Sequence, residues 1–316
     1  MEELIIGKND AGQRIDKFLI KKYKNLPTSL MYKLIRKKKI TLNRKRVKEN
    51  DILTEGDLIL IFAPTDVLTA GKSKTFTRNK DIKVAYEDEN IIIVNKESGL
   101  LVHSDTEDNE DTLIDRITAY LIEREEYNPE SEHSFAPALC NRIDRNTEGL
   151  VIAAKNANAL REMNEIVKQR QVEKLYLTVV HGIISPKNGE IKLLLQKDSE
   201  KNIVKVKQGI GKNTKPAITR YKTIDYNKQK DLSLLEVELI TGRTHQIRAS
   251  FAHIGHPLLG DGKYAVNKKD REMGYKSQAL CAYSLKFTDC RQYKTLNYLQ
   301  GLVVTATQPD FLKLFN

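Results

Sequence analysis

The segment 141–145 (NRIDR) places a carboxylate, Asp144, between two arginines. Thr147 and Gly149 follow it, at the entry to an apolar stretch that begins at Leu150. Positive neighbours keep a carboxylate ionised near neutral pH, and an ionised, positioned aspartate can act as a nucleophile. On its own, so short a motif is more typical of a surface turn held by arginine–aspartate pairs. Asp144 is therefore a candidate nucleophile, and its assignment depends on evidence from other segments.

Two further segments carry side chains suited to chemistry. Tyr176, in the segment 174–176 (KLY), offers an aromatic ring against which an unstacked base could pack. A tyrosine in this pattern is also an ordinary half-buried strand residue. Residues 241–248 (TGRTHQIR) predict a turn that leads into a helix, on which His245 and Arg248 share a face.

The histidines and cysteines do not form a metal-binding pattern. No cysteine or carboxylate cluster accompanies the histidines of residues 245–256, so we predict no metal. The cysteines are odd in number and contain no CxxC pair, which predicts neither a disulfide framework nor a cysteine zinc site. They are expected to be reduced thiols. The residues concerned are His245, His253, His256, Cys140, Cys281 and Cys290.

The positive charge of the chain is concentrated near its N-terminus. The formal net charge is +11, and residues 13–50 hold fourteen Lys or Arg against two acidic residues. The rest of the 316-residue chain is close to neutral. Basic surface binds polyanions by displacing their counterions, so we assign polyanion binding to this N-terminal part. A solvated lysine-rich face is the alternative.

Two short helices followed by strands are expected in the N-terminal part. Apolar residues between Ile15 and Tyr23 fall on one helical face, and a second helix is predicted after Pro27, with Thr28 or Ser29 as its N-cap. A strand at residues 40–42 and a tight turn at 43–44 follow, and another strand is predicted at 58–62.

This order resembles the small αL RNA-binding domain of S-four type. The resemblance rests on residues 14–19 (RIDKFL), 34–37 (LIRK) and 56–59 (GDLI), and Lys38 and Arg44 stand where the family often has glycine. It implies RNA as the partner of residues 11–64. The candidate RNA-binding residues are Arg14, Lys17, Arg36, Lys37, Lys38, Lys39, Arg44, Lys45 and Arg46.

Residues 65–80 are rich in Thr and Lys and predict a linker. Residues 81–316 form a second predicted domain, of α+β class, with a mixed, largely antiparallel sheet flanked by helices. Helices are expected after a cap at Asp111 and over 157–170. Strands are expected at 82–86, 90–95, 150–154, 172–180, 191–195, 218–224, 232–240, 280–287 and 302–306.

The second domain resembles the RluA-type RNA pseudouridine synthases. Residues 141–150 are similar to the family signature H-R-L-D-x-x-T-S-G-L, residues 174–176 to K-x-Y, and residues 241–248 to T-G-R-x-H-Q-I-R. Segments 95–103 and 255–261 are also similar to family motifs. Asn141, Ile143 and Glu148 depart from the usual signature, but none of these departures removes the carboxylate of Asp144. Glu97 stands where proline is usual in its motif.

The resemblance implies a role for each matching residue. Asp144 would be the nucleophile, Arg248 its ion-pair partner, and Tyr176 the aromatic wall of the pocket. Leu280 would form another pocket wall, although an ordinary core leucine is an equal reading of the pattern. Arg142 would help to extrude the target uridine.

The implied reaction isomerises uridine in RNA to pseudouridine. The bond from ribose C1′ to N1 of uracil breaks, the base turns, and C1′ joins C5, so no cofactor is needed. Asp144 could attack the sugar or take a proton from ribose C2′. Large-subunit ribosomal RNA is the favoured substrate and transfer RNA is possible. A non-catalytic RNA-binding or ribosome-assembly protein and a hydrolytic nucleosidase are the alternatives.

The sequence also predicts the cellular location of the protein. No stretch has the roughly 18 to 20 apolar residues needed to span a bilayer, and the N-terminus lacks the order of a signal peptide. We expect a cytoplasmic monomer that does not contact membranes.

Overall fold

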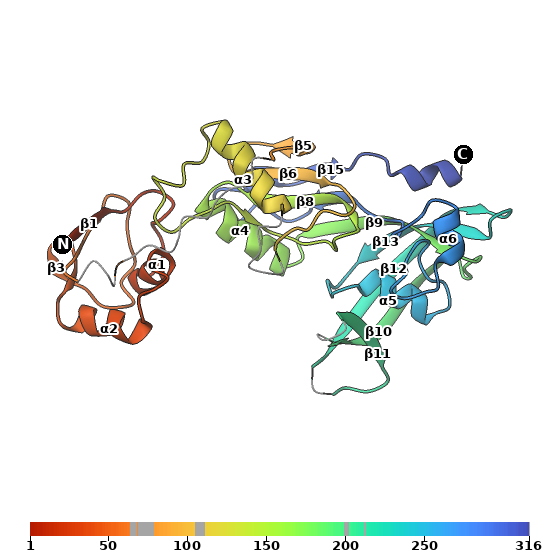
Figure 1. Ribbon diagram of the computed structural model, residues 1–316, viewed down its shortest axis with the longest axis horizontal. Helices are drawn as coiled ribbons and strands as arrows, with labels where there is room; N and C mark the ends of the chain where they lie inside the picture. Colours follow the sequence, from red (N-terminus) through yellow and green to blue (C-terminus); the bar gives the residue numbers. More distant parts are fainter. Residues whose placement is uncertain (64–67, 69–78, 105–110, 199–201, 212, 316) are drawn as a thin grey trace.

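The computed structural model describes residues 1–63, 68, 79–104, 111–198, 202–211 and 213–315. Two sheets organise them, a small one near the N-terminus and a large one in the rest of the chain (Figure 1). The predicted linker at 65–80 lies almost wholly outside the described residues.

The N-terminal part is a small α/β unit with its own core. Its elements are β1 (Glu2–Ile5), α1 (Ile15–Lys22), α2 (Thr28–Arg36), β2 (Ile40–Leu42), β3 (Lys45–Arg46) and β4 (Leu58–Ile61). The strands form an antiparallel sheet in the order β1-β4-β2-β3. Phe18, Leu19 and Met31 from the helices pack with Ile59 and Ile61 of the sheet. The strand β1 was not predicted, and it precedes residue 11.

Local turns in this part follow the sequence closely. The predicted turn at Asn43 and Arg44 is present, and both residues have left-handed φ angles, 52° and 62°, as a two-residue hairpin requires. Lys38 is also left-handed, with φ 57°, so two positions where the family often has glycine keep a glycine-like backbone. The predicted cap at Thr28 or Ser29 is wrong, because the extended Pro27 precedes the helix and Thr28 is already its first residue.

The N-terminal unit contacts the rest of the chain through polar side chains. The Asp10 carboxylate accepts hydrogen bonds from the backbone N–H and the hydroxyl of Ser134, at 3.0 and 2.6 Å. The Asn9 amide donates to Glu132 at 2.6 Å, and Phe18 meets His133 edge to face. These contacts fix the unit at one end of the elongated molecule (Figure 1).

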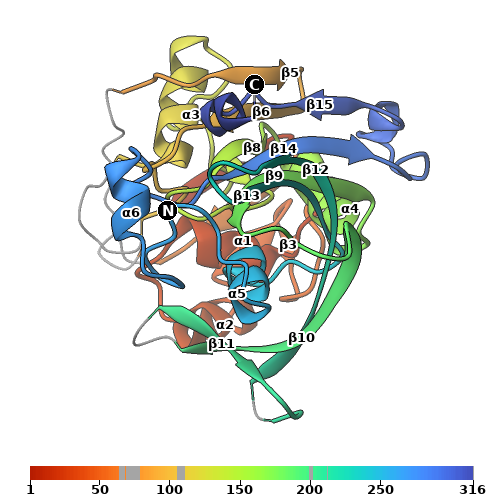
Figure 2. The same ribbon diagram turned by 90° about the vertical axis from the view of Figure 1, so that its right-hand side faces the viewer.

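The large sheet is mixed and mainly antiparallel, as predicted. Its path is β11-β10-β12-β13-β9-β14-β8-β6-β5, with β15 paired to β14 and β7 to β8. Figure 2 shows the long strands β10 and β12 curving toward the side of the molecule on which β11 lies. The strands are β5 (Val84–Glu87), β6 (Ile91–Lys96), β7 (Ala138–Leu139), β8 (Glu148–Ala154), β9 (Val172–His181), β10 (Asn188–Asp198), β11 (Ile203–Lys207), β12 (Thr214–Asn227), β13 (Leu232–Leu239), β14 (Leu280–Phe287) and β15 (Val303–Thr305).

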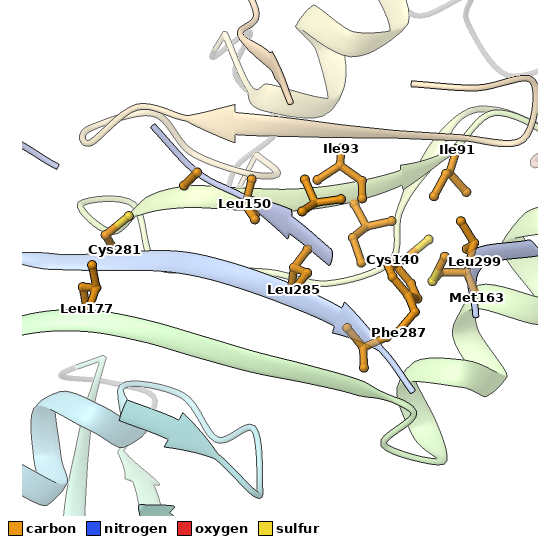
Figure 3. Packing of buried hydrophobic residues seen from close by; sticks show 14 of the residues in the cluster. Ile91, Ile93, Cys140, Leu150, Met163, Leu177, Cys281, Leu285, Phe287 and Leu299 are labelled. Carbon is orange, nitrogen blue, oxygen red and sulfur yellow. The ribbon is translucent and has the colours of Figure 1, made fainter. Parts of the chain in front are cut away.

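Helices cover both faces of this sheet. Alternate residues of a strand face opposite sides, and in β6 Ile91 and Ile93 join one core while Ile92 and Val94 join another. The first core includes residues of α4 (Ala157–Lys168) and the second includes residues of α3 (Leu113–Glu123). Figure 3 shows the first core, in which Met163 and Leu299 lie near Cys140.

The predicted cap at Asp111 is wrong. Thr112 is the N-cap of α3, and its hydroxyl accepts from the Asp115 N–H. Asp111 instead forms an ion pair with Arg116 at 2.6 Å. The remaining helices are α5 (Gln246–His253) and α6 (Lys268–Glu272), with short 3₁₀ turns at Asn297–Leu299 and Asp310–Leu314. Among the described residues, no helix is long and apolar enough to cross a bilayer.

One parallel pair, β8 with β14, positions the segments that matter for the site. Parallel strands begin at the same edge of a sheet, so the loop before β8, which carries Asp144, lies beside Leu280 at the start of β14. The two strands approach closely because Gly149 has no side chain. A Cβ at Gly149 would lie 2.3 Å from the carbonyl oxygen of Ala282, and its φ of 109° also favours glycine.

Candidate active site

A pocket of about 530 Å³ opens where the loop before β8, the strand β9 and the segment before α5 meet. This volume lies in the range typical of ligand sites. All five residues that the sequence predicted for catalysis and substrate binding line it, namely Asp144, Arg248, Tyr176, Arg142 and Leu280. They come from four separate segments, so the fold brings the predicted residues together.

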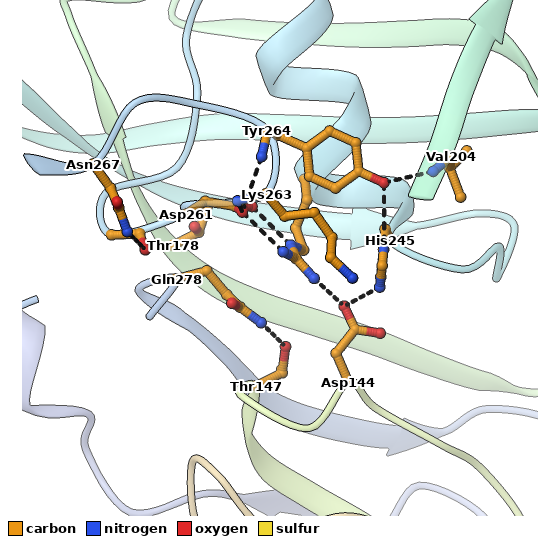
Figure 4. Close-up of polar contacts among 12 residues, drawn as sticks. Asp144, Thr147, Thr178, Val204, His245, Asp261, Lys263, Tyr264, Asn267 and Gln278 are labelled. Atoms are coloured by element: carbon orange, nitrogen blue, oxygen red, sulfur yellow. Dashed lines mark hydrogen bonds and ion pairs between the residues drawn. The ribbon is translucent and has the colours of Figure 1, made fainter. Parts of the chain in front are cut away.

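Arg248, a buried residue of this pocket, joins the two carboxylates of Asp144 and Asp261, which are labelled in Figure 4. Arg248 Nη1 donates to Asp144 Oδ2 at 3.1 Å. Its Nε and Nη2 donate to the two oxygens of Asp261 at 2.7 and 2.8 Å, in the two-pronged geometry that a guanidinium favours. Burial by itself lowers the pKa of Arg248, but the bonds and charges of Asp261 and Asp144 outweigh burial and raise it. The guanidinium therefore stays charged, and its orientation is fixed by Asp261.

The cation that contacts Asp144 is distant in sequence. Arg145, the arginine next to Asp144, turns away and donates from Nε to the carbonyl of Gly99 at 3.0 Å. Arg142 is exposed at the pocket wall. The arginine that contacts Asp144 is Arg248, 104 positions further along the chain, which the resemblance implied as its ion-pair partner.

A buried lysine holds the backbone beside Asp144. Lys96 Nζ donates to the carbonyls of Arg145, Glu97 and Leu100 at 2.7 to 2.9 Å. Burial lowers the pKa of Lys96 to about 7, against the opposing charges of Asp144 and Glu148. These three bonds fasten the loop 97–100 to the loop that carries Asp144.

His245 also faces Asp144, in a conformation that the sequence did not predict. It precedes α5 as the N-cap, with φ 49°, so the prediction that it shares a helical face with Arg248 is wrong. The Gln246 side chain accepts from the Thr241 hydroxyl and the Arg243 N–H, and thereby closes the turn before the helix. With the turn closed in this way, the imidazole Nε2 lies 3.7 Å from Asp144 Oδ2.

The histidine is buried and neutral. Burial lowers the pKa of His245 to about 4, although the Asp144 charge opposes this shift. Its Nδ1 lies 3.0 Å from the Tyr264 hydroxyl, which in turn accepts from the Val204 N–H (Figure 4). A neutral imidazole that accepts the tyrosine proton at Nδ1 carries its own proton on Nε2, toward Asp144.

Apolar side chains also line the pocket. Tyr176 and Leu280 are both buried and belong to one core cluster. Burial raises the pKa of the Tyr176 hydroxyl, and the nearby Asp144 charge adds to this effect. The tyrosine therefore stays protonated and presents a ring beside a carboxylate.

Three residues of this site were missing from the sequence prediction. Asp261 lies in a segment that resembled a family motif, yet its partner could not be predicted because Arg248 is on another element. Lys96 also lies in a segment similar to a family motif, but its role could not be predicted, and Tyr264 gave no signal beyond its residue type. Among the described residues, no group of three or more His, Cys, Asp or Glu side chains could hold a metal ion.

The candidate RNA-binding residues of the N-terminal unit are all exposed. Arg14 is engaged by Asp16, to which its Nη2 donates at 2.7 Å. No ion pair with a described residue involves the other eight, Lys17, Arg36, Lys37, Lys38, Lys39, Arg44, Lys45 and Arg46. Their charges remain available to a polyanion.

Comparisons with known proteins point to one family. The family described as RNA pseudouridylate synthase matches residues 90–253, and the S4 domain matches residues 13–59. An RNA pseudouridine synthase of Mycoplasma genitalium is 33% identical over 90% of this chain and 88% of its own length. Ribosomal large subunit pseudouridine synthase C of Vibrio vulnificus is 33% identical over 90% of this chain and 87% of its own.

A solved structure shares the fold. Human RNA pseudouridylate synthase domain containing 4 aligns with a TM-score of 0.56 over 73% of this chain and 90% of its own, at 20% sequence identity.

The buried histidine predicts a pH dependence of stability. The pKa of His245 is about 4 in the folded protein and 6.5 for an unperturbed histidine, so the unfolded chain binds more protons between these values. The free energy of unfolding should therefore fall as pH drops from 6.5 to 4, by up to about 3 kcal/mol from this residue.

Urea denaturation at several pH values measures this effect. His245→Asn is the comparison, because asparagine tolerates the left-handed backbone and does not titrate. We expect a shallower loss of stability for the variant across this window. Parallel curves for the two proteins would show that His245 is not the group responsible.

Proposed function

Because this chain belongs to the RNA pseudouridylate synthase family, we propose that it isomerises specific uridines of large-subunit ribosomal RNA through Asp144. The observation that carries the proposal for Asp144 is its position, 3.1 Å from a buried arginine and at the wall of a pocket that also holds Tyr176 and Leu280. The relatives named for the large ribosomal subunit support this substrate. A non-catalytic RNA-binding protein, the alternative from another class, would not need this arrangement.

Each side chain in the pocket has a task in the proposed reaction. Asp144, oriented by Arg248, reacts at the ribose, either at C1′ or by taking the C2′ proton. Tyr176 and Leu280 contact the uracil once it has left its stack, which partly offsets the cost of unstacking. Arg142, exposed at the pocket wall, fills the place that the flipped nucleotide leaves.

The reaction balances without any other reagent. The C1′–N1 bond breaks, C1′–C5 forms, and the proton on C5 is exchanged for one on N1. A pocket that excludes water keeps the detached uracil beside the sugar. The pocket contains one carboxylate, Asp144, among its lining residues, whereas hydrolytic glycosidases use two carboxylates around a water.

The N-terminal unit, which consists of the predicted residues 11–64 together with the segment that carries β1, would hold structured RNA through phosphates and shape. Its eight cations that pair with no described residue support this assignment, and residues 81–316 would form the catalytic domain. The protein would act as a monomer in the cytoplasm, where bacterial ribosomes are assembled.

The first prediction from the proposed function concerns the nucleophile. Asp144→Asn preserves shape and most hydrogen bonding but removes the charge, so isomerisation should become undetectable while RNA binding survives. Release of tritium from uracil C5 in ribosomal RNA measures turnover. The control is Asp225→Asn, an exposed aspartate on β12, which should keep the parental rate. Multiple turnover by Asp144→Asn would remove this residue from the mechanism.

The second prediction concerns the arginine. Lysine keeps the charge of Arg248 but lacks the planar fork that contacts Asp261 and Asp144 together. Arg248→Lys should lower single-turnover isomerisation at least about tenfold, and Arg248→Met should lower it further. Thermal melting run beside these assays separates lost orientation from lost folding. A folded Arg248→Met variant with the parental rate would disprove the pairing.

The third prediction concerns the basic surface. Replacing Lys37, Lys39 and Arg46 with glutamine should weaken binding to a large-subunit ribosomal RNA transcript. The slope of log affinity against log salt should also become shallower, by about 0.7 to 0.9 for each phosphate that the variant no longer neutralises. The matched control replaces Lys222, Lys228 and Lys230, exposed lysines on and beside the turn between β12 and β13. Equal slopes for the two triple variants would contradict RNA binding by the N-terminal unit.

A further inference from the structure

Lys174 is a cation in the pocket that the site described above does not use. It lies on β9 two positions before Tyr176, a spacing that puts both residues on one side of a strand, and both line the pocket. The side chain is half-buried. Among the described residues, none forms a hydrogen bond or an ion pair with its ammonium group.

Other lysines withdrawn from solvent in this protein have partners. Lys96 donates to three carbonyls, and Lys155 contacts Glu87, Glu126 and the carbonyl of Asp88. A charged group removed from water is costly unless it is paired. Burial lowers the pKa of Lys174, and no acidic group of the described chain opposes the shift. The described part of the fold therefore leaves this desolvated ammonium, inside the pocket, without a counter-charge.

The charge around the pocket favours an anion. The lining residues include one carboxylate, Asp144, and six cations, Arg142, Lys168, Arg170, Lys174, Arg243 and Arg248. Several of these are already engaged, since Arg248 holds Asp144, Lys168 contacts Glu165, and Arg243 donates to the Pro216 carbonyl. The rest of the chain outside residues 13–50 is close to neutral, so this concentration of positive charge is local to the pocket.

We propose that Lys174 forms a phosphate subsite inside the pocket, which binds a phosphate attached to the target uridine. This inference rests on the proposed function, because it takes the pocket to hold one nucleotide. Tyr176 and Leu280 provide the contacts for the base, and Asp144 faces the sugar. The phosphate is the part of the nucleotide that these three residues leave without a partner, and a lysine ammonium is a common phosphate ligand.

The subsite has a consequence for how the substrate is held. A phosphate fixed at Lys174 and a base fixed at Tyr176 are anchored by residues two positions apart on the same strand. The sugar between them is thereby held against Asp144, and such positioning converts binding energy into correct orientation of the reacting atoms. Lys174 is thus a binding residue that acts on the same nucleotide as the catalytic aspartate.

The test compares a nucleoside with its two monophosphates. Uridine, uridine 5′-monophosphate and uridine 3′-monophosphate are titrated into the full-length protein, with binding followed by ligand-observed NMR. We expect one monophosphate to bind the parent about tenfold more tightly than uridine, as a charge-assisted contact would give. The monophosphate that binds more tightly than uridine shows whether the subsite holds the 5′ or the 3′ phosphate.

Substitutions assign that gain to one side chain. Lys174→Met keeps the aliphatic stem and should remove the preference for the monophosphate, with uridine binding unchanged. Lys228→Met removes one positive charge from the turn between β12 and β13, away from the pocket lining, and should keep the preference. A preference that survives in Lys174→Met, or a parent without any preference, would overturn the proposal. Lys174→Gln provides the same comparison if the methionine variant does not fold.

This outcome is separable from that of the proposed function. Nucleotide binding is measured without turnover, and it can be repeated in the Asp144→Asn background, where no isomerisation is expected. If the parent prefers a monophosphate but releases no tritium from ribosomal RNA, the result supports the phosphate subsite and contradicts the proposed reaction. If the parent releases tritium but does not prefer a monophosphate, the result supports the proposed reaction and contradicts the phosphate subsite.

Discussion

Arg248 connects two carboxylates that come from different parts of the chain, and most of the site geometry follows from that contact. A guanidinium buried to this extent needs charged partners, because an unpaired buried charge costs several kcal/mol. Asp261 supplies two of its bonds and leaves Nη1 directed at Asp144. The loop before β8, the helix α5 and the segment after it must therefore all be in place before the aspartate has its partner. Folding and assembly of the site are in this sense one event.

Around this contact, the site is held by polar groups that have partners. Lys96 ties two loops together through three carbonyls, and the Gln246 side chain closes the turn that sets His245. Buried networks of this kind specify one arrangement when every member has a partner. Lys174 differs from them, and its lack of a partner among the described residues is the reason to connect it with substrate.

Local features of the sequence predicted local features of the structure. The hairpin at Asn43 and Arg44, the amphipathic helices and most of the strands depend on nearby residues, and they were predicted correctly. The resemblance to a family implied Asp144 and Arg248 as site residues, and in the structure both line one pocket. The left-handed conformation of His245 and the bond between Arg248 and Asp261 could not be predicted, because both depend on contacts that only the folded chain makes. The strand β1 was missed because its pairing partner, β4, lies more than fifty residues away.

The parallel pairing of β8 and β14 has a consequence for how members of this fold can vary. Asp144 and Leu280 are set by the starts of two neighbouring strands, and Gly149 keeps those strands in close contact. The strand β11 forms one edge of the sheet and is separated from β14 by four strands, so the register of β8 with β14 does not depend on that edge. Changes at this edge could meet a different RNA while Asp144 and Leu280 keep their register, provided that the Val204 N–H that Tyr264 accepts stays in place.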